Sequence, residues 1–401
     1  MSEVQTVLLS MLSQSLFNKV SFFNEADWVQ LLTEADGQAV TQLIYSVIDV
    51  NKLSEEEAIR WKERSSAHLA NNIRIIHNHA LVHEWMTDAD IPYVILKGCA
   101  SASYYPNPVY RSMGDVDFLV PTVMLEKAGK VLESNGLKPW EEEHISHIVY
   151  RKKGMHLEMH FNVAGMPEGK AGELVREYLS DVFEKAELHE LGNGKIMLPS
   201  AFHHGLIILL HTCHHMTGEG VGLRHLCDWA VFVNGFSDEE FCEMFEDKLK
   251  AIGLWKFAQV LTYVSSKYLG ADQKIWALCD DELADELIED ILTGGNFGKK
   301  ETGRSLQTML ISDRGKNGVG NTGMGTQFVQ SINNLVVHHW PKAKNNPALL
   351  TAGWVYFGSR RAFRELTGKR NKTDISKLVD EASKRRNIYM KLHLYETKEN
   401  E

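Results

Sequence analysis

Residues Val94 to Pro121 read VILKGCASASYYPNPVYRSMGDVDFLVP, and two aspartates near the end of this segment are separated by one apolar residue. Side chains two positions apart in a strand face the same side, so Asp115 and Asp117 project together if the chain is extended there. Mg²⁺ prefers a few carboxylate oxygens beside water and phosphate. Taken alone, however, such a pair more often consists of two solvated aspartates on a turn or an edge strand than of two metal ligands.

The surrounding residues favour the metal site. The segment HLEMHF places Glu158 on a later predicted strand as a third carboxylate, with a histidine on either side of it on the same face. Gly98 directly follows a buried strand, where the missing side chain lets backbone N–H groups approach a phosphate. Lys97 and Arg111 supply positive charge for a polyphosphate.

Outward from this segment, short strands alternate with helices. IPYVILKG, DVDFLVP, HIVYRKK and HLEMHFNV predict strands, and TVMLEKAGKVLESNG predicts a helix that ends at Gly136. The residues before this region show helical spacing, with a capping box at Ser54 and Glu57, and the chain is helical again after Leu198 and Pro199. We expect an α+β protein with a helical N-terminal region (1–88), a core built on a small mixed β-sheet (89–197) and a helical C-terminal domain (198–401).

Composition limits the class of protein and its partners. The chain has 401 residues, of which 44% are hydrophobic and 24% charged, as in folded globular proteins. The formal net charge is −10 and there is no block of basic residues, so we expect no long nucleic acid as a partner. We expect neither a signal peptide nor a membrane span. Five cysteines without a CxxC pair fit a reduced, cytoplasmic protein.

The order of the motifs resembles the nucleotidyltransferase superfamily related to DNA polymerase beta. That superfamily has a strand, a glycine turn into a helix, a strand bearing Asp-x-Asp and a third acidic residue on a later strand. More narrowly, LKG, YP, Arg111 with DVDFLV, LEMHF, RHLCDWA and GGNFG, which follow one another within residues 70 to 300, are similar to bacterial proteins described as uncharacterised nucleotidyltransferases.

The resemblance implies a reaction and a set of site residues. Asp115 and Asp117 would bind Mg²⁺ or Mn²⁺, Glu158 would be the third carboxylate, and Gly98 would lie in a turn facing the phosphates. A nucleoside monophosphate would move from a nucleoside triphosphate such as ATP to an unidentified hydroxyl or amine on a small molecule, a protein or a tRNA end, with Glu158 as ligand or proton acceptor. The catalytic and metal-binding candidates are thus Asp115, Asp117 and Glu158, and the nucleotide-binding candidates are Lys97, Gly98, Arg111 and Arg224.

The sequence also departs from the superfamily pattern. Cys99 follows Gly98 where serine or glycine is expected, so the hydroxyl that would bind the terminal phosphate is missing unless Ser101 or Ser103 provides one. The spacing from Gly98 to Asp115 is also long. A catalytically inactive nucleotide-binding or regulatory protein on the same fold is therefore the alternative function.

The segment AFHHGLIILLHTCHHM contains five histidines: His203, His204, His211, His214 and His215. His211 and His215 are one helical turn apart and could ligate zinc together, but the HExxH motif is absent. We favour structural or substrate-contact roles for this helix over a zinc site, and we keep a zinc-dependent hydrolase as a third hypothesis.

Three further patterns leave alternatives open. In GLRHLCDWAVF, Arg224 and Asp228 either pair with each other four residues apart or act together on a phosphate or acceptor. In GGNFGKK, Lys299 and Lys300 are candidate phosphate neighbours, although a helix C-cap explains the glycines equally well. GVGNTG, residues 318–323, matches GxGxxG but lacks a preceding strand, so we expect a loop.

Overall fold

The computed structural model describes residues 1–20, 25–140, 146–192, 194–300, 303–311, 323–367 and 374–396. The N-terminal region is helical, as predicted. Its helices are α1 (Glu3–Phe17), α2 (Trp28–Gly37), α3 (Thr41–Tyr45) and α4 (Glu55–Asp88). The capping box at the start of α4 is confirmed, because the Ser54 side chain accepts from the Glu57 backbone and the Glu57 side chain accepts from the Ser54 backbone.

A five-stranded mixed sheet follows, in the order β1-β2-β5-β4-β3. Its strands are β1 (Val94–Ile95), β2 (Val116–Leu119), β3 (Lys138–Pro139), β4 (His147–Lys152) and β5 (Met155–His160). β2 and β5 are parallel neighbours, and the other pairs in this sheet are antiparallel. The predicted α+β class is thus confirmed, although β1 is much shorter than the apolar run that predicts it.

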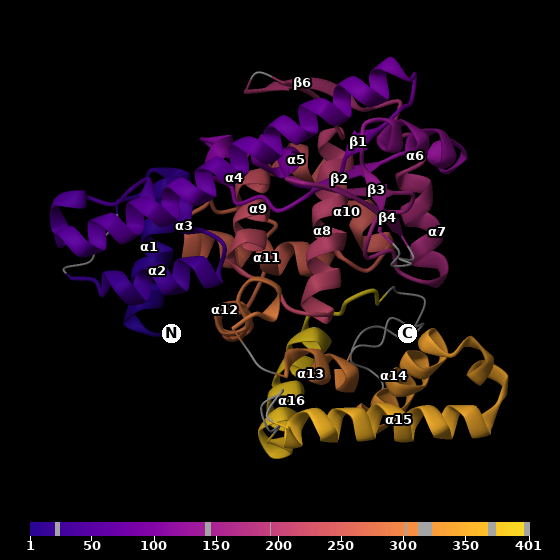
Figure 1. Cartoon of the computed structure of the whole chain (residues 1–401). Helices are drawn as coiled ribbons and strands as arrows, with labels where there is room; N and C mark the ends of the chain where they lie inside the picture. Colours follow the sequence, from indigo (N-terminus) through magenta and orange to yellow (C-terminus); the bar gives the residue numbers. More distant parts are fainter. Residues whose placement is uncertain are drawn as a thin grey trace.

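Helices cover the sheet and fill the space beside it. The short helix α5 (Cys99–Ala102) follows β1, α6 (Leu125–Ser134) joins β2 to β3, and α7 (Gly169–Tyr178) follows β5. A separate hairpin of β6 (Glu187–Leu191) and β7 (Gly194–Leu198), which the sequence patterns do not predict, lies along α4 at the top of Figure 1. The helical half then begins with α8 (Ala201–Thr217), α9 (Leu223–Asn234), α10 (Asp238–Ala251), α11 (Trp255–Leu269) and α12 (Asp281–Gly294).

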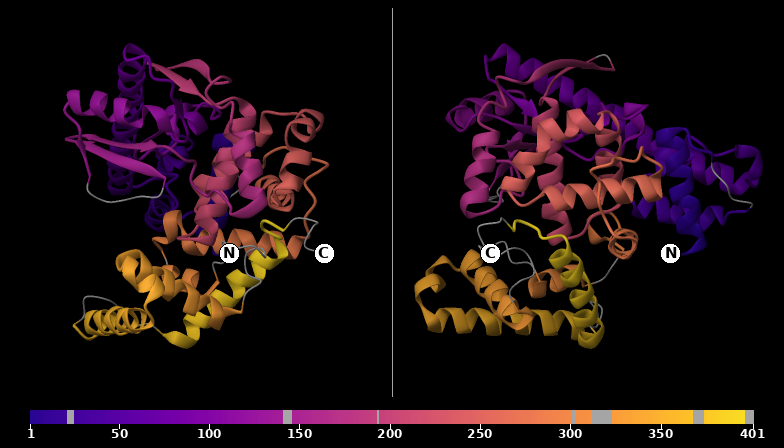
Figure 2. Two further views of the ribbon diagram at one scale, coloured as in Figure 1. Left: turned by 90° about the vertical axis from the view of Figure 1, so that its right-hand side faces the viewer. Right: turned by 180° about the vertical axis from the view of Figure 1, so that it is seen from behind.

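The last helices form a layer below the rest of the molecule in Figure 1, and Figure 2 shows the same separation in both views. They are α13 (Arg304–Ile311), α14 (Met324–His339), α15 (Pro347–Leu366) and α16 (Ile375–Lys391). The last of these helices, α16, is polar in composition but still contributes buried side chains. α16 buries Ala382, Arg385 and Tyr389, and Arg385 donates to the Met216 carbonyl at the end of α8. The glycine motif at 318–323 lies, except for Gly323, outside the described residues.

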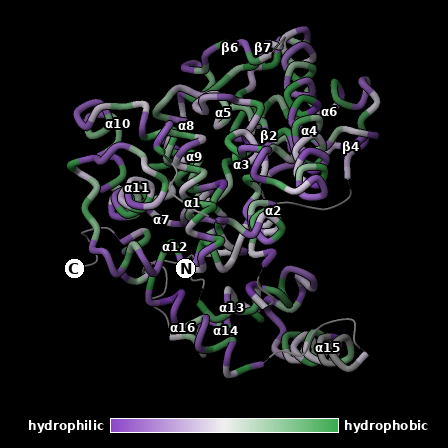
Figure 3. Tube along the Cα trace, turned by 90° about the vertical axis from the view of Figure 1, so that its left-hand side faces the viewer, coloured by the Kyte–Doolittle hydropathy of each residue, from purple (hydrophilic) through white to green (hydrophobic). Residues whose placement is uncertain are grey.

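Two buried clusters hold the described part of the chain together. One unites α1 to α3, the first half of α4 and the helices α8 to α12, and the other joins the sheet to α6 and the second half of α4. Figure 3 shows hydrophobic residues running through the sheet and its covering helices, whereas α16 is largely hydrophilic. Of the helices in the described ranges, none combines the length and apolar character needed to cross a bilayer.

Candidate active site between the sheet and helices α8 and α9

Three carboxylates meet where β2 and β5 run side by side. Asp117 on β2 is the register partner of Glu158 on the parallel strand β5. Register partners on neighbouring strands point to the same face of the sheet, and Asp115 precedes Asp117 by two residues. All three side chains line one cavity of about 340 Å³. The sheet therefore brings together the three acidic residues that the sequence patterns indicate.

Asp117 is the most enclosed of the three and is already paired. Its Oδ1 lies 2.8 Å from Nζ of Lys97 and 3.0 Å from Nε2 of His160. Burial alone would raise the pKa of Asp117, but the Lys97 charge and the hydrogen bond from His160 outweigh burial and hold it well below the usual value. Asp117 is therefore a carboxylate anion whose position is fixed from two sides.

Asp115 shows the opposite behaviour because it lies beside a charged carboxylate. The charge of Asp117, together with burial, raises the pKa of Asp115 to about 7. Lys97 and Arg224 lower this pKa but do not cancel the effect. The site thus carries more negative charge than its own cations neutralise.

Gly98 is required by backbone geometry as well as by the space around it. Its φ is +60°, and a Cβ at this position would meet the His79 ring at 3.3 Å. Cys99 after it is fully buried. Of the two serines that could provide the missing hydroxyl, Ser103 donates to the Ala100 carbonyl, whereas Ser101 lines the cavity and its buried Oγ has no hydrogen-bond partner. Ser101 is therefore the better candidate.

Asp228 pairs with Arg111, so of the two alternatives for Arg224 and Asp228 their mutual pairing is the one that the structure disfavours. Arg111 donates from Nε and Nη2 to the two Asp228 oxygens, at 2.7 and 2.6 Å, and Tyr105 donates to the same carboxylate at 2.7 Å. Burial opposes charge on Arg111, but Asp228 more than compensates and raises the Arg111 pKa. The planar guanidinium of Arg111 binds the Asp228 carboxylate through two parallel hydrogen bonds, which is the geometry that an arginine–carboxylate pair prefers.

Arg224 is left facing the cavity instead. Its Nε has no hydrogen-bond partner, and its guanidinium lies 5.1 Å from the Phe297 ring centre, in the GGNFG segment. The glycines of that segment act as the C-cap of α12, where Gly295 has a φ of +67°. Lys300 binds Glu34 at 2.6 Å and does not line the cavity, which disfavours a phosphate contact by this lysine.

A second cavity of about 490 Å³ adjoins the first, because Lys97, Glu158, His211 and His215 line both. We call the two together the cleft. It lies between the sheet on one side and α8 and α9 on the other. The cleft also receives His225 from α9, which is absent from the sequence-based candidates because no pattern within α9 links it to α8.

The donor set fits a hard divalent cation. Carboxylate oxygens are the ligands that Mg²⁺ prefers, and the unneutralised charge around Asp115 is what a cation would relieve. Within the described ranges, however, the ligand atoms of Asp115, Asp117 and Glu158 do not all lie within 4.8 Å of one another, as those of His147, Glu158 and His160 do. Lys97 and His160 hold Asp117 in its present position, so a metal would compete with them.

The fold and the site together define a nucleotidyltransferase core: a small mixed sheet in which an Asp-x-Asp strand lies beside a strand with a third acidic residue. The chain belongs to the family described as Uncharacterised nucleotidyltransferase, which it matches over residues 24–270. No curated protein matches the chain.

Two solved structures resemble part of the chain, and each match spans 51% of it. One is the solution structure of the antibiotic-resistance factor ANT(2'')-Ia, 10% identical with a TM-score of 0.30, and the match covers 95% of it. The other is the crystal structure of an antigenic nucleotidyltransferase-like protein from Paracoccidioides brasiliensis, 14% identical with a TM-score of 0.33 and likewise 95% covered.

Proposed function

We propose that this protein transfers a nucleoside monophosphate from a nucleoside triphosphate to a hydroxyl or amine acceptor, with Mg²⁺ or Mn²⁺ held by Asp115, Asp117 and Glu158. The observation that carries the proposal is the register of β2 and β5, which sets Asp117 beside Glu158 on the face where Asp115 also opens into the cleft. A bound divalent ion would neutralise phosphate charge there.

The chain's own residues have distinct roles in this proposal. Arg224, which lines the cavity and whose buried Nε has no hydrogen-bond partner among the described residues, binds phosphate oxygens, and Ser101 supplies the hydroxyl that Cys99 lacks. Lys97 neutralises Asp117, and His160 orients it. The predicted phosphate contact by Arg111 requires its ion pair with Asp228 to open.

The transfer itself needs little from the protein beyond position and charge. The acceptor oxygen or nitrogen forms a bond to the α-phosphorus, the bond from that phosphorus to pyrophosphate breaks, and the acceptor proton moves to Glu158 or to water. We propose Glu158 as the proton acceptor because it lines both halves of the cleft.

The test is calorimetric titration of each of the four common nucleoside triphosphates, with Mg²⁺ and with EDTA, into the wild type and into Asp115→Asn and Glu158→Gln variants. We expect Mg²⁺-dependent binding of at least one nucleotide, weakened tenfold or more in both variants. Glu173→Gln, which removes an exposed carboxylate from α7, should bind like the wild type. Equal binding in all variants would place the nucleotide elsewhere.

A second candidate function is a nucleotide-binding protein without turnover. It is favoured by the two contacts that hold Oδ1 of Asp117, because Lys97 and His160 occupy an oxygen that a metal would need. Measuring pyrophosphate release distinguishes the two functions, because an active nucleotidyltransferase should release pyrophosphate slowly even when water is the acceptor. Nucleotide binding without any pyrophosphate release above that of Asp115→Asn would support the non-catalytic function.

A further inference from the structure

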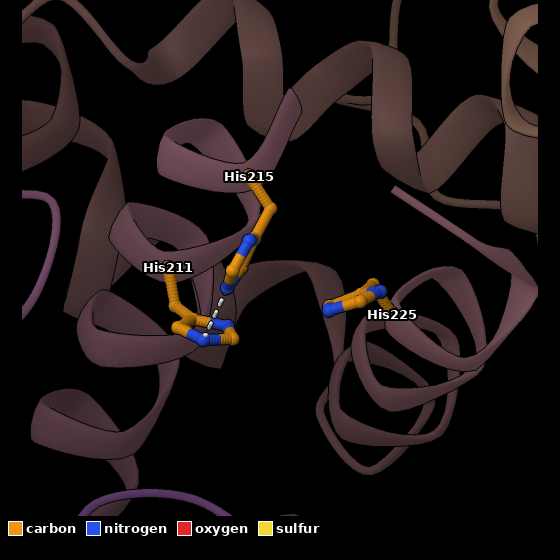
Figure 4. A group of neighbouring side chains, drawn as sticks. All are labelled: His211, His215 and His225. Carbon is orange, nitrogen blue, oxygen red and sulfur yellow. Dashed lines mark hydrogen bonds between the residues drawn. The ribbon is translucent and has the colours of Figure 1, made fainter. Parts of the chain in front are cut away.

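Three histidines gather on the wall of the cleft that faces the carboxylates. His211 and His215 come from successive turns of α8, and His225 comes from the first turn of α9. Their ligand nitrogens all lie within 4.8 Å of one another. Figure 4 shows His225 turning one ring nitrogen toward the other two rings across the gap between the helices.

The hydrogen-bond pattern leaves nitrogen atoms of this cluster with nothing to bind. Nε2 of His211 and Nε2 of His215 face each other at 2.9 Å, so only one of the two can carry the shared proton. Nε2 of His225 is buried without any hydrogen-bond partner. Its Nδ1 accepts from the Gly222 N–H at 3.4 Å, at the long end of the hydrogen-bond range, and metal binding at Nε2 would move the ring proton to Nδ1 and give up this weak contact. Leaving a buried nitrogen unpaired is unfavourable, and a ligand would remove that penalty.

Burial disfavours the protonated form of the three rings, and neutral imidazole is the form that binds metal. Burial lowers the pKa of His215 to about 2 and takes those of His211 and His225 well below the usual value. Phe297 packs against His215 and His225, with ring centres 4.8 and 5.4 Å apart, and closes one side of the cluster.

Charges of both signs surround the cluster. Lys97 and Arg224 oppose a cation, but the Lys97 ammonium is bound to Asp117 at 2.8 Å. Asp115, Glu158 and Glu219 line the same cavity and favour a cation. The charges around the cavity therefore do not oppose a positive ion beside the three histidines as strongly as Lys97 and Arg224 alone would.

The geometry and the ligand type select a metal other than Mg²⁺. Imidazole suits Zn²⁺ and its neighbours in the first transition row, whereas Mg²⁺ prefers oxygen. At Zn–N distances of about 2.0 to 2.1 Å, tetrahedral ligand nitrogens lie about 3.3 to 3.4 Å apart. The His211 and His215 nitrogens must separate slightly to reach this spacing, and His225 must approach them. Three imidazoles with a remaining open position are typical of a zinc site that also binds a substrate or water oxygen.

We propose that His211, His215 and His225 form a site for Zn²⁺ or a similar nitrogen-preferring divalent ion, with its open position toward the cleft. This site is separate from the carboxylate site. It does not depend on nucleotidyl transfer, and it does not require the HExxH motif, because its third ligand comes from another helix.

The test is titration of Co²⁺, a spectroscopic substitute for Zn²⁺, into the metal-stripped full-length protein. We expect one equivalent to give the visible ligand-field absorption of nitrogen ligation and to be displaced by Zn²⁺, apart from any Co²⁺ bound by the carboxylates. His215→Gln and His225→Gln should each weaken Co²⁺ binding at least tenfold. His215→Gln is the safer variant because this side chain is only half buried, and circular dichroism checks that both variants remain folded.

Two control variants assign the signal. His147→Gln removes a ligand from the other group of potential metal ligands, which contains Glu158 and His160, and His77→Gln removes an exposed histidine of α4. Both should bind Co²⁺ as the wild type does. Absence of the absorption, its survival in His215→Gln and His225→Gln, or its loss in His147→Gln would overturn the proposal. Each of these results is obtained without nucleotide, so it leaves the proposed function to be judged separately.

Discussion

Arg111 and Asp228 form a buried, two-pronged ion pair that joins the segment before β2 to α9, with exposed side-chain fractions of 6% and 9%. Removing one member of such a pair leaves an uncompensated buried charge, which costs about 3 to 5 kcal/mol. Replacing both members by apolar groups of similar size is much less harmful. The pair therefore makes a structural contribution that is distinct from nucleotide binding.

We expect Arg111→Ala to lower the free energy of unfolding by about 3 to 5 kcal/mol, and Arg111→Met combined with Asp228→Leu to recover most of that loss. Urea unfolding followed by circular dichroism measures both. Lys130→Ala, in the exposed pair with Glu126, is the control and should show no measurable change. If Arg111→Ala left the free energy of unfolding unchanged, the ion pair would contribute little to holding α9 in place.

Arg224 is expected to act on the ligand rather than on stability. Hydrogen bonds to charged groups contribute about 1.5 to 3 kcal/mol, so Arg224→Gln should weaken binding of the Mg²⁺-nucleotide complex about 10- to 100-fold. Titration calorimetry measures this effect, with the exposed Lys250→Gln on α10 as the control. Unchanged affinity in Arg224→Gln would remove Arg224 from the nucleotide site.

Local spacing in the sequence was sufficient to predict which candidate residues lie together, and insufficient for contacts between distant parts of the chain. Asp115 and Asp117 line the same cavity, as strand alternation predicts for the segment DVDFL, although Asp115 itself lies just before β2. The partner of Arg111 lies 117 residues away, and nothing in the sequence near either residue indicates it. The same is true of His225, whose neighbours on α8 are set only by how two helices pack.

At the scale of elements, α8 combines apolar packing with buried histidines that cannot easily take up a proton. His204 stacks on Tyr104 with ring centres 5.1 Å apart, and neither of its ring nitrogens has a hydrogen-bond partner. Burial lowers its pKa to about 3. The unfolded chain binds a proton here below about pH 6.5 and the folded chain does not, so acid favours the unfolded state.

Stability should therefore fall as the pH drops from about 6.5 toward 3, with His204 contributing up to about 1.4 kcal/mol per pH unit. His204→Phe removes this contribution, and its loss of stability between pH 6.5 and 5 should be about 2 kcal/mol smaller than that of the wild type. Urea unfolding at several pH values measures the difference. His77→Gln should keep the wild-type slope, and an equal slope in His204→Phe would contradict the assignment.

The elements themselves were predicted where a periodic pattern runs long enough. The capping box and apolar spacing locate α4, and alternation locates β2, β4 and β5. The sequence patterns did not predict the hairpin of β6 and β7, because β6 is almost wholly exposed and lacks the apolar alternation of a strand with one buried face. α16 is polar in composition, yet it packs through a few residues, including Arg385.

At the scale of the whole molecule, the cleft is where the two buried clusters meet. Its walls come from β2 and β5 on one side and from α8 and α9 on the other. A ligand that fills the cleft therefore contacts both clusters and opposes their separation. The stabilisation follows mass action and reaches about 2.7 kcal/mol at a free ligand concentration of 100 Kd.

Addition of Mg²⁺ and the preferred nucleotide should accordingly slow amide hydrogen exchange in β2, β5 and α9 together. Exchange in α14 and α15 should not change, because none of the residues described in these helices lines the cleft. Mass spectrometry of peptic fragments measures both regions in one experiment. Protection limited to one wall, or centred on α14 and α15, would contradict a ligand bound between the clusters.

The most direct test of the central claim is the position of a Mn²⁺ ion, located by anomalous diffraction in crystals grown with Mn²⁺ and a nucleoside α,β-methylene triphosphate, which cannot release pyrophosphate. We predict an ion bound by Asp115, Asp117 and Glu158, with the triphosphate beside it and Arg224 on its oxygens. Nucleotide and Mn²⁺ bound away from these carboxylates would contradict the account.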